Sequence, residues 1–155
     1  MIFGWGKKAK QGAAQLKAAS IRMEKKEAVE ATIAVMIGGM YADGKVTDQE
    51  QEQFAGQLEH NEIFAGYPAA EIGAVSDRVF GYYKLGAIMG EKKVLDEIRD
   101  LAGDKEASVN VCTVLYSMLV SDTPEGEEPK LEGKELAYFD KVSKILGVTL
   151  KEITG

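Results

Sequence analysis

Four carboxylates occupy matching places in two similar stretches of the sequence. Asp43 and Glu50 belong to the first stretch, and Asp122 and Glu135 belong to the second. Hard divalent cations such as Ca²⁺ and Mg²⁺ bind several oxygen ligands, which these side chains would supply if the two stretches converge. Zn²⁺ fits less well, because it favours His and Cys ligands and neither stretch contains one beside its acids. The sequence therefore predicts a divalent-cation site and no organic cofactor.

A purely structural interpretation of the first stretch is also open. The segment from Thr47 to Glu50 has the S/T-x-x-E pattern of a capping box, in which the glutamate accepts the backbone N–H of the threonine. Asp43-Gly44 is a common turn pair. Neither stretch is an EF-hand, because the sixth position counted from Asp43 is Asp48 rather than glycine. The carboxylates would then only stabilise helix ends.

Catalysis is not expected. Two carboxylates without a cleft signature are more often structural than a general acid and base. The single cysteine, Cys112, lies in an apolar stretch and is expected in the core, and the single histidine, His60, is expected to be exposed. The segment GAIMG at positions 86–90 lacks the lysine of a phosphate loop and indicates a helix-packing or hinge feature. The sequence thus predicts a binding protein and no enzyme.

An internal repeat positions the four carboxylates. Residues 32–42 match residues 111–121 in character, and each run ends in a small residue followed by an aspartate. A glutamate follows each aspartate, seven positions later in the first copy and thirteen in the second. Each copy therefore reads as a buried helix, an acidic loop and a second helix. Two such halves are expected to pair about a pseudo-twofold axis.

Apolar residues recur at helical spacing along the chain, and strand alternation is nearly absent. We expect an all-α fold, a single helical domain of about seven helices. Asp104 is expected to cap one helix, and Gly103 and Gly147 are expected to end two others. The expected helices cover residues 28–42, 48–59, 68–83, 92–102, 105–121 and 135–146, with a short terminal turn opened by a capping box at 149–152.

Charge divides the chain into a basic N-terminal arm, residues 1–27, and an acidic domain, residues 28–155. The arm has a net charge of +5 and the rest of the chain −11. An acidic domain repels phosphate backbones, so we expect no nucleic-acid partner. Phe3, Trp5 and the lysines that follow could contact an anionic membrane surface. The favoured alternative is that the arm folds back onto the acidic domain.

A cytoplasmic location is expected, either free or at the inner face of the membrane. A lone cysteine excludes an internal disulfide. The uncharged runs at 31–42 and 107–121 are shorter than the roughly 20 residues of a membrane span. The first residues are apolar and then basic, the reverse of the order in a signal peptide, so the mature chain is expected to begin at Met1.

The paired pattern resembles the TerB family of tellurite-resistance proteins. The resemblance covers residues 28–147 and rests on an apolar helix followed by Ala42-Asp43-Gly44-Lys45-Val46-Thr47, Glu50 and Phe54. A second copy has Ser121-Asp122, Leu131, Glu135 and Phe139. The resemblance implies a helical fold of two similar halves and divalent-cation binding by acidic residues. It also implies a stress response to tellurite, phage or colicins, with cytoplasmic and membrane-embedded protein partners.

Two departures from the TerB pattern fall in the second copy. Thr123-Pro124 stands where the first copy has Gly44, and the loop is longer. The overall expectation is a TerB-type protein that binds a divalent cation through its paired acidic loops and acts as a cytoplasmic sensor or scaffold. The alternative is a metal-independent interaction module whose acidic surface binds a basic partner.

Overall fold

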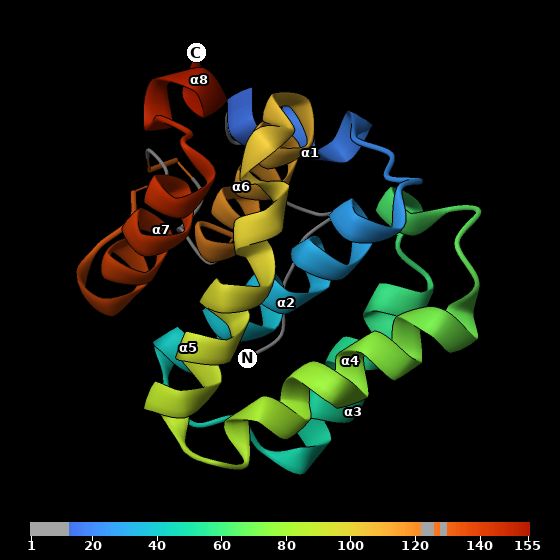
Figure 1. Ribbon diagram of the computed structural model, residues 1–155. Coiled ribbons are helices and arrows are strands. Elements are labelled where there is room, and N and C mark those ends of the chain that lie inside the picture. The colour runs from blue at the N-terminus through green and yellow to red at the C-terminus, as the bar shows by residue number, and fades with distance from the viewer. Residues whose placement is uncertain (1–12, 122–125, 128–129) are drawn as a thin grey trace.

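The computed structural model describes residues 13–121, 126–127 and 130–155, and these residues form one helical domain (Figure 1). No strand occurs in the described ranges, so the all-α, single-domain prediction is confirmed. About seven helices were expected, and the described residues form eight α-helices and two 3₁₀ helices. The α-helices are α1 (Ala13–Ser20), α2 (Lys26–Asp43), α3 (Asp48–Glu59), α4 (Ala69–Tyr83), α5 (Ala87–Ile98), α6 (Lys105–Leu119), α7 (Gly133–Leu146) and α8 (Leu150–Thr154), and the 3₁₀ helices are η2 (Glu62–Phe64) and η3 (Arg99–Gly103).

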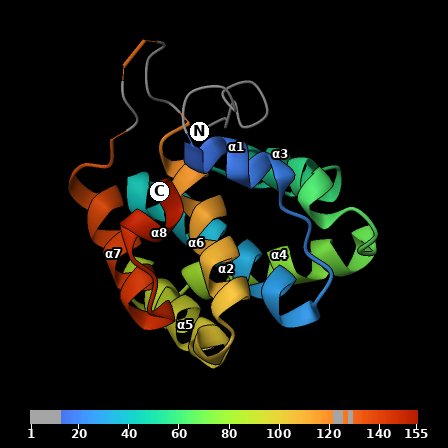
Figure 2. The same cartoon turned by 90° about the horizontal axis from the view of Figure 1, so that it is seen from above.

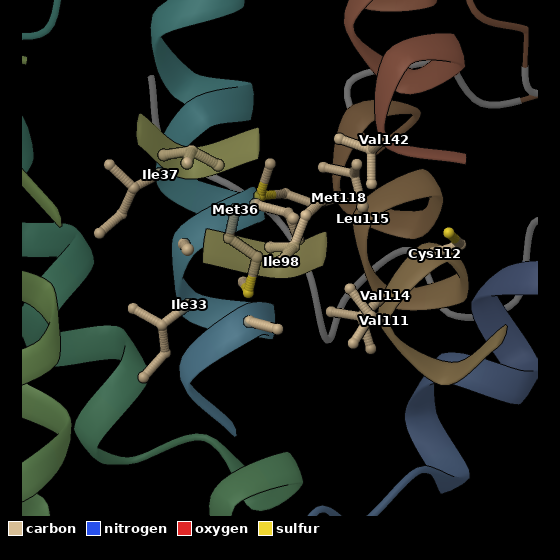
Figure 3. Packing of buried hydrophobic residues seen from close by; sticks show 14 of the residues in the cluster. Ile33, Met36, Ile37, Ile98, Val111, Cys112, Val114, Leu115, Met118 and Val142 are labelled. Carbon is tan, nitrogen blue, oxygen red and sulfur yellow. The ribbon is translucent and has the colours of Figure 1, made fainter. Parts of the chain in front are cut away.

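Two apolar helices, α2 and α6, form the centre of the domain. A helix that is apolar on every side must be covered on every side. Accordingly, α2 packs against α4, α5, α6 and α7, and α6 packs against α1, α2, α7 and α8 (Figures 1 and 2). Figure 3 shows Ile33 and Met36 of α2 in one cluster of buried side chains with Val111 and Leu115 of α6. The two uncharged runs therefore are buried helices, as the sequence predicts.

Glycines let α2 approach its neighbours closely. A Cβ atom at Gly38 would overlap the hydroxyl of Tyr138, and one at Gly39 would overlap the side chain of Met118. The Tyr138 hydroxyl donates a hydrogen bond of 2.8 Å to the backbone carbonyl of Val35. These glycines thus allow α7 and α6 to pack directly on the backbone of α2.

The second helices of the two repeat units pack differently. Helix α7 lies against both α6 and α2, whereas α3 packs mainly against α4. Phe54 of α3 has an edge-to-face contact with Phe80 of α4, and its counterpart Phe139 of α7 has one with Tyr116 of α6. The pseudo-twofold relation between the halves stays a prediction.

The fifth helix has different bounds from those expected. The pattern at 92–102 predicts one helix ended by Gly103, but α5 runs from Ala87 to Ile98 and η3 follows it. Gly86 has a positive φ of 110°, which ends the preceding turn and lets α5 begin at the next residue. Ile88 and Met89 of its first turn are exposed, so no amphipathic pattern marks the start. Asp104 caps α6 as expected, accepting the N–H of Ala107 at 3.1 Å.

The described part of the N-terminal arm packs on the rest of the domain. Helix α1 lies against α6 and α8, and Lys17 donates to the carbonyl of Ile153 at 3.1 Å. Arg22 forms an ion pair with Glu62, and Lys25 forms one with Asp104. Phe3, Trp5 and the first lysines lie outside the described residues. No helix in the described ranges has the length and apolar character to cross a membrane.

Candidate functional site

The first predicted ligand, Asp43, lies at the end of α2. Helix α2 stops there because Gly44 has a φ of 147°, and its N–H donates to the carbonyl of Tyr41 at 3.2 Å. A φ in this region favours glycine. The turn predicted from Asp43-Gly44 is therefore confirmed, and the aspartate sits where the chain leaves the helix.

The second predicted ligand, Glu50, takes part in a capping box. Its backbone N–H donates to the Thr47 hydroxyl at 3.1 Å, and its Oε1 accepts the Thr47 N–H, also at 3.1 Å. The same arrangement joins Thr149 and Glu152 at the start of α8. Both predicted capping boxes are confirmed. The box fixes the orientation of the Glu50 carboxylate relative to the loop.

Asp43 and Glu50 line the same surface cavity. Its volume is about 290 Å³, and its wall also includes Met40, Lys45 and Val46. A cavity of this size holds a hydrated ion, since one water occupies about 30 Å³ of liquid. The loop between α2 and α3 thus brings together the two carboxylates that the first half was predicted to contribute.

Of the two ligands predicted in the second half, the structure describes Glu135. Glu135 lies in the first turn of α7, as predicted, and Leu131 before it is buried. Asp122 lies outside the described residues. Within the described ranges, no group of three or more His, Cys, Asp or Glu side chains is close enough to hold a metal ion. The four-carboxylate site therefore stays a hypothesis, with two of its members shown to share a cavity.

Two other candidate residues have the surroundings that the sequence predicts. Cys112 is fully buried in α6, and this burial raises the pKa of its thiol to about 12. His60 is exposed at the end of α3, where its Nδ1 lies 2.9 Å from the carbonyl of Gly56. A protonated, buried thiol is a poor nucleophile, so Cys112 is a core residue.

No residue pattern indicates the aromatic pocket that lies between α2, α4 and α5. The rings of Tyr41 and Tyr83 stack with their centroids 4.0 Å apart and an angle of 4° between their planes. Glu91 and Ile88 of α5 complete a cavity of about 190 Å³ beside them. Helical periodicity relates only residues that are close in sequence, so it does not predict this stack. Tyr41 and Tyr83 meet because α2 and α4 pack against each other.

The segment at 86–90 helps to shape this pocket. A Cβ atom at Gly90 would overlap the ring of Tyr83, so only glycine lets α5 lie this close to the tyrosine. The packing function predicted for GAIMG is therefore confirmed. Tyr83 itself packs against the domain, since only 7% of its surface is exposed.

Comparisons with protein-family models, curated protein sequences and solved structures found no match for this chain. The candidate sites therefore rest on their own geometry: one acidic cavity at the end of α2 and one aromatic pocket nearby.

Proposed function

We propose that this chain is a TerB-type stress-response protein that binds a divalent cation between its acidic loops and acts as a sensor or scaffold. The observation that carries the proposal is the cavity shared by Asp43 and Glu50. Ca²⁺ or Mg²⁺ suits these oxygen ligands better than Zn²⁺. Asp122 and Glu135 would supply the remaining carboxylates. The proposed role is binding, and no reaction is assigned to the site.

Packing of the two central helices supports a shared site. In the sequence repeat Gly39 corresponds to Met118, and these two residues contact each other where α2 and α6 pack together. Each stands within five residues of the end of its helix. This contact therefore lies near the C-terminal ends of both helices, from which the two acidic segments continue. This arrangement favours convergence of the acidic segments that follow the two helices.

Charge supports the same proposal. Residues 28–155 have a net charge of −11, which raises the local concentration of cations around the domain. In this proposal the protein acts on the cytoplasmic side of the membrane. Its partners would be cytoplasmic and membrane-embedded proteins of a tellurite-resistance system. Cation binding would change the charge of the loop that such a partner contacts.

Calorimetric titration of chelator-treated protein with Ca²⁺, Mg²⁺ and Zn²⁺ tests the proposal. We expect micromolar binding of Ca²⁺ or Mg²⁺ that weakens at least about tenfold in Asp43→Asn and in Glu50→Gln, because each removes a charged ligand. Glu50→Gln is informative because glutamine also forms capping boxes. Asp122→Asn and Glu135→Gln test the second loop in the same way.

Two control variants separate the ion site from the helix cap. Thr47→Ala removes the hydroxyl of the capping box but keeps both carboxylates and the backbone N–H that orients Glu50, so it should retain cation binding. Asp77→Asn removes one charge from an exposed position on α4 and should also retain it. Absence of binding in the unmodified protein, or equal weakening by Asp77→Asn, would exclude a specific site and leave Glu50 as a cap residue only.

The metal-independent interaction module remains the second candidate, and one observation favours it. Three large apolar side chains are exposed within five residues of the connection between α4 and α5: Leu85 at 67%, Ile88 at 89% and Met89 at 43%. Exposed large apolar side chains that gather on a surface are typical of protein interaction sites. Partner binding that depends on salt and not on divalent cations would favour this candidate.

A further inference from the structure

The connection between α4 and α5 exposes a run of apolar residues, positions 85–89, which we call the apolar tip. All five residues are exposed, and three of them have large apolar side chains: Leu85, Ile88 and Met89. In Figure 1 the tip lies at the lower end of the molecule, opposite α1 and α8. Burying such side chains is favourable, so the tip is suited to contact with another surface.

Lysines surround the apolar tip. Lys84 precedes it, and Lys92 and Lys93 stand one turn beyond its last residues on the same faces of α5. All three lysines are exposed. With three lysines and one glutamate, the segment 84–93 has a net charge of +2, although the domain to which it belongs has −11. The tip is therefore a basic region on an acidic domain.

The acidic side chains of α5 nearest to these lysines already have partners. Glu91 forms an ion pair with Lys141 at 2.8 Å. Asp96 forms one with Lys92, also at 2.8 Å, and both members of this pair are exposed. Exposed ion pairs are weak, so Lys92 can exchange this partner for another anion. The described contact of Lys93 is with an aromatic ring, whose centroid lies 5.4 Å from its ammonium.

The order of these residues along α5 matches the layers at the surface of a bilayer. Helix α5 begins at the tip and ends at Ile98, which is buried in the core. A residue four positions later in a helix lies about 6 Å further along its axis. The two lysines of α5 therefore stand about that far behind the end of the tip. Apolar groups that enter a lipid surface reach about 5 to 10 Å into it, which places such lysines at the level of the phosphates.

Composition favours a lipid surface over a protein partner. Lysine is depleted at the centres of protein interfaces, where tyrosine, tryptophan and arginine are enriched. The segment 84–93 contains three lysines and none of those three residue types. Lysines beside exposed apolar residues are typical of regions that bind anionic lipids, because cations attract the headgroups and apolar side chains are buried among them.

We propose that the apolar tip docks this domain on an anionic lipid surface, with its three large side chains at the edge of the acyl chains and the three lysines against lipid phosphates. Gly86 gives α5 no side-chain cap, so the N–H groups of the first turn need water or lipid oxygens, which limits the depth of entry to the headgroup region. The surface is separate from the N-terminal arm. It includes no residue of the proposed cation site.

Co-sedimentation of the full chain with lipid vesicles provides the first test. Phosphatidylcholine vesicles with about 30% phosphatidylserine should bind at least about tenfold more tightly than pure phosphatidylcholine, because each lysine near an anionic surface strengthens binding about fivefold. The buffer contains chelator, so that no cation bridges Asp43 or Glu50 to lipid, and about 0.15 M salt, which screens distant charges. Absence of binding, or equal affinity for the two vesicles, would overturn the proposal.

Two serine variants identify the tip. Leu85→Ser and Ile88→Ser should each weaken vesicle binding about threefold to tenfold, because less apolar surface is then buried in lipid. Leu150→Ser is the matched control, since Leu150 is 48% exposed on α8 at the opposite end of the molecule, and it should leave binding unchanged. Unchanged binding in both tip variants would assign the contact to the N-terminal arm and exclude the tip.

Charge variants test the lysines. Lys92→Gln combined with Lys93→Gln should weaken binding to the anionic vesicles about tenfold or more, whereas Lys151→Gln on α8 should not. Asp43→Asn should not weaken vesicle binding, although it should weaken cation binding in the separate titration. Weakening by Asp43→Asn in chelator would assign the lipid contact to the acidic loop and overturn the proposal. Each site can therefore fail without the other.

A fluorescent label reports which end of the molecule meets the lipid. Ala87→Cys, labelled with a dye that brightens in apolar surroundings, should show a blue shift on the anionic vesicles, and the same dye at Lys151→Cys should not. Cys112 is buried and should not take up the label. A shift at both positions or at neither would overturn the proposal. So would a dimer in sedimentation velocity that Ile88→Ser dissociates, because the tip would then bind a second copy.

Discussion

The hydroxyl of Tyr138 in α7 donates a 2.8 Å hydrogen bond to the carbonyl of Val35, near the middle of α2. Gly38 stands one turn further along α2 and faces the same hydroxyl, so that a Cβ atom there would overlap it. The hydrogen bond from Tyr138 links α7 to α2, and the lack of a side chain at Gly38 lets the two helices lie close together. Burial is complete at this point, since Tyr138 is 2% exposed and Val35 is 0% exposed.

Gly38→Ala should therefore destabilise the protein by about 2 kcal/mol or more, because overpacking in a filled core forces side chains or backbone to shift. Urea unfolding measures this change. Tyr138→Phe alone should cost about 1 kcal/mol through loss of the hydrogen bond. The double variant should lose less stability than the sum, because the alanine methyl then meets no hydroxyl.

Gly56→Ala is the matched control for Gly38→Ala. Gly56 lies within α3, and no atom lies within 4 Å of the position that its Cβ would occupy. This substitution should stabilise the protein by about 0.5 to 1 kcal/mol, since alanine favours helix over glycine. If both glycine variants lost stability equally, close packing at Gly38 would not be the cause.

The cap at the start of α3 can be tested apart from its charge. Thr47→Ala should cost about 1 kcal/mol, because it leaves the N–H of Glu50 without its side-chain acceptor. Glu50→Gln should change stability by only about 0.5 kcal/mol or less, since glutamine accepts the Thr47 N–H equally well. Thermal unfolding with chelator present gives both values. A Glu50→Gln loss as large as that of Thr47→Ala would mean that the carboxylate charge itself stabilises the loop.

Acid should remove part of the stability supplied by Asp104. The N–H of Ala107 and then the ammonium of Lys25 bond to its carboxylate and lower its pKa below the ordinary value of 3.8. A lowered folded-state pKa gives stability that is present above 3.8 and lost as pH falls through the folded-state value. Asp104→Asn keeps a good cap residue and removes this titration.

The unfolding free energy of Asp104→Asn should therefore fall less steeply than that of the unmodified protein when pH drops below about 4. Urea unfolding at a series of pH values measures the slope. Asp77→Asn removes a charge from an exposed position on α4 and serves as the control. The prediction would be contradicted if the unfolding free energies of the unmodified protein and of Asp104→Asn fell equally steeply below about pH 4.

Cys112 should be unreactive in the folded protein. Its burial in α6 raises the pKa of the thiol to about 12, so almost no thiolate exists at neutral pH, and reagents do not reach it. A disulfide exchange reagent at pH 8 should label it only as fast as the protein opens, and urea should accelerate labelling. Rapid stoichiometric labelling in buffer would show that α6 opens far more often than its packing implies.

Much of the helical architecture could be predicted from residue patterns. The uncharged runs at 31–42 and 107–121 identify α2 and α6, because no charged side chain there needs water. The start of α3 at Asp48 follows from the capping residue Thr47, and the end of α7 follows from Gly147, which has a φ of 70°. Capping residues and glycines next to the helix ends determine these bounds, so the bounds can be predicted from the sequence alone.

Features that depend on how helices cross could not be predicted. The start of α5 was missed because the exposed side chains of Ile88 and Met89 break the amphipathic pattern. The Tyr41–Tyr83 stack was missed because it requires the crossing of α2 and α4. For the predicted acid site, spacing identified Asp43 and Glu50, which share a cavity. Whether Asp122 and Glu135 approach Asp43 and Glu50 depends on the conformation of the loops. The spacing of residues in the sequence does not predict that conformation.

The position of α2 in the chain has a consequence during synthesis. Residues 31–42 of α2 carry no charged side chain, and α4, α5, α6 and α7, which cover this helix, all follow it in the sequence. A ribosome therefore releases this segment well before its cover has been made, and the Tyr138 contact closes only when α7 emerges. Translation proceeds at about 5 to 20 residues per second, so α2 waits for several seconds. During that interval the nascent chain presents its most apolar helix to chaperones and to other nascent chains.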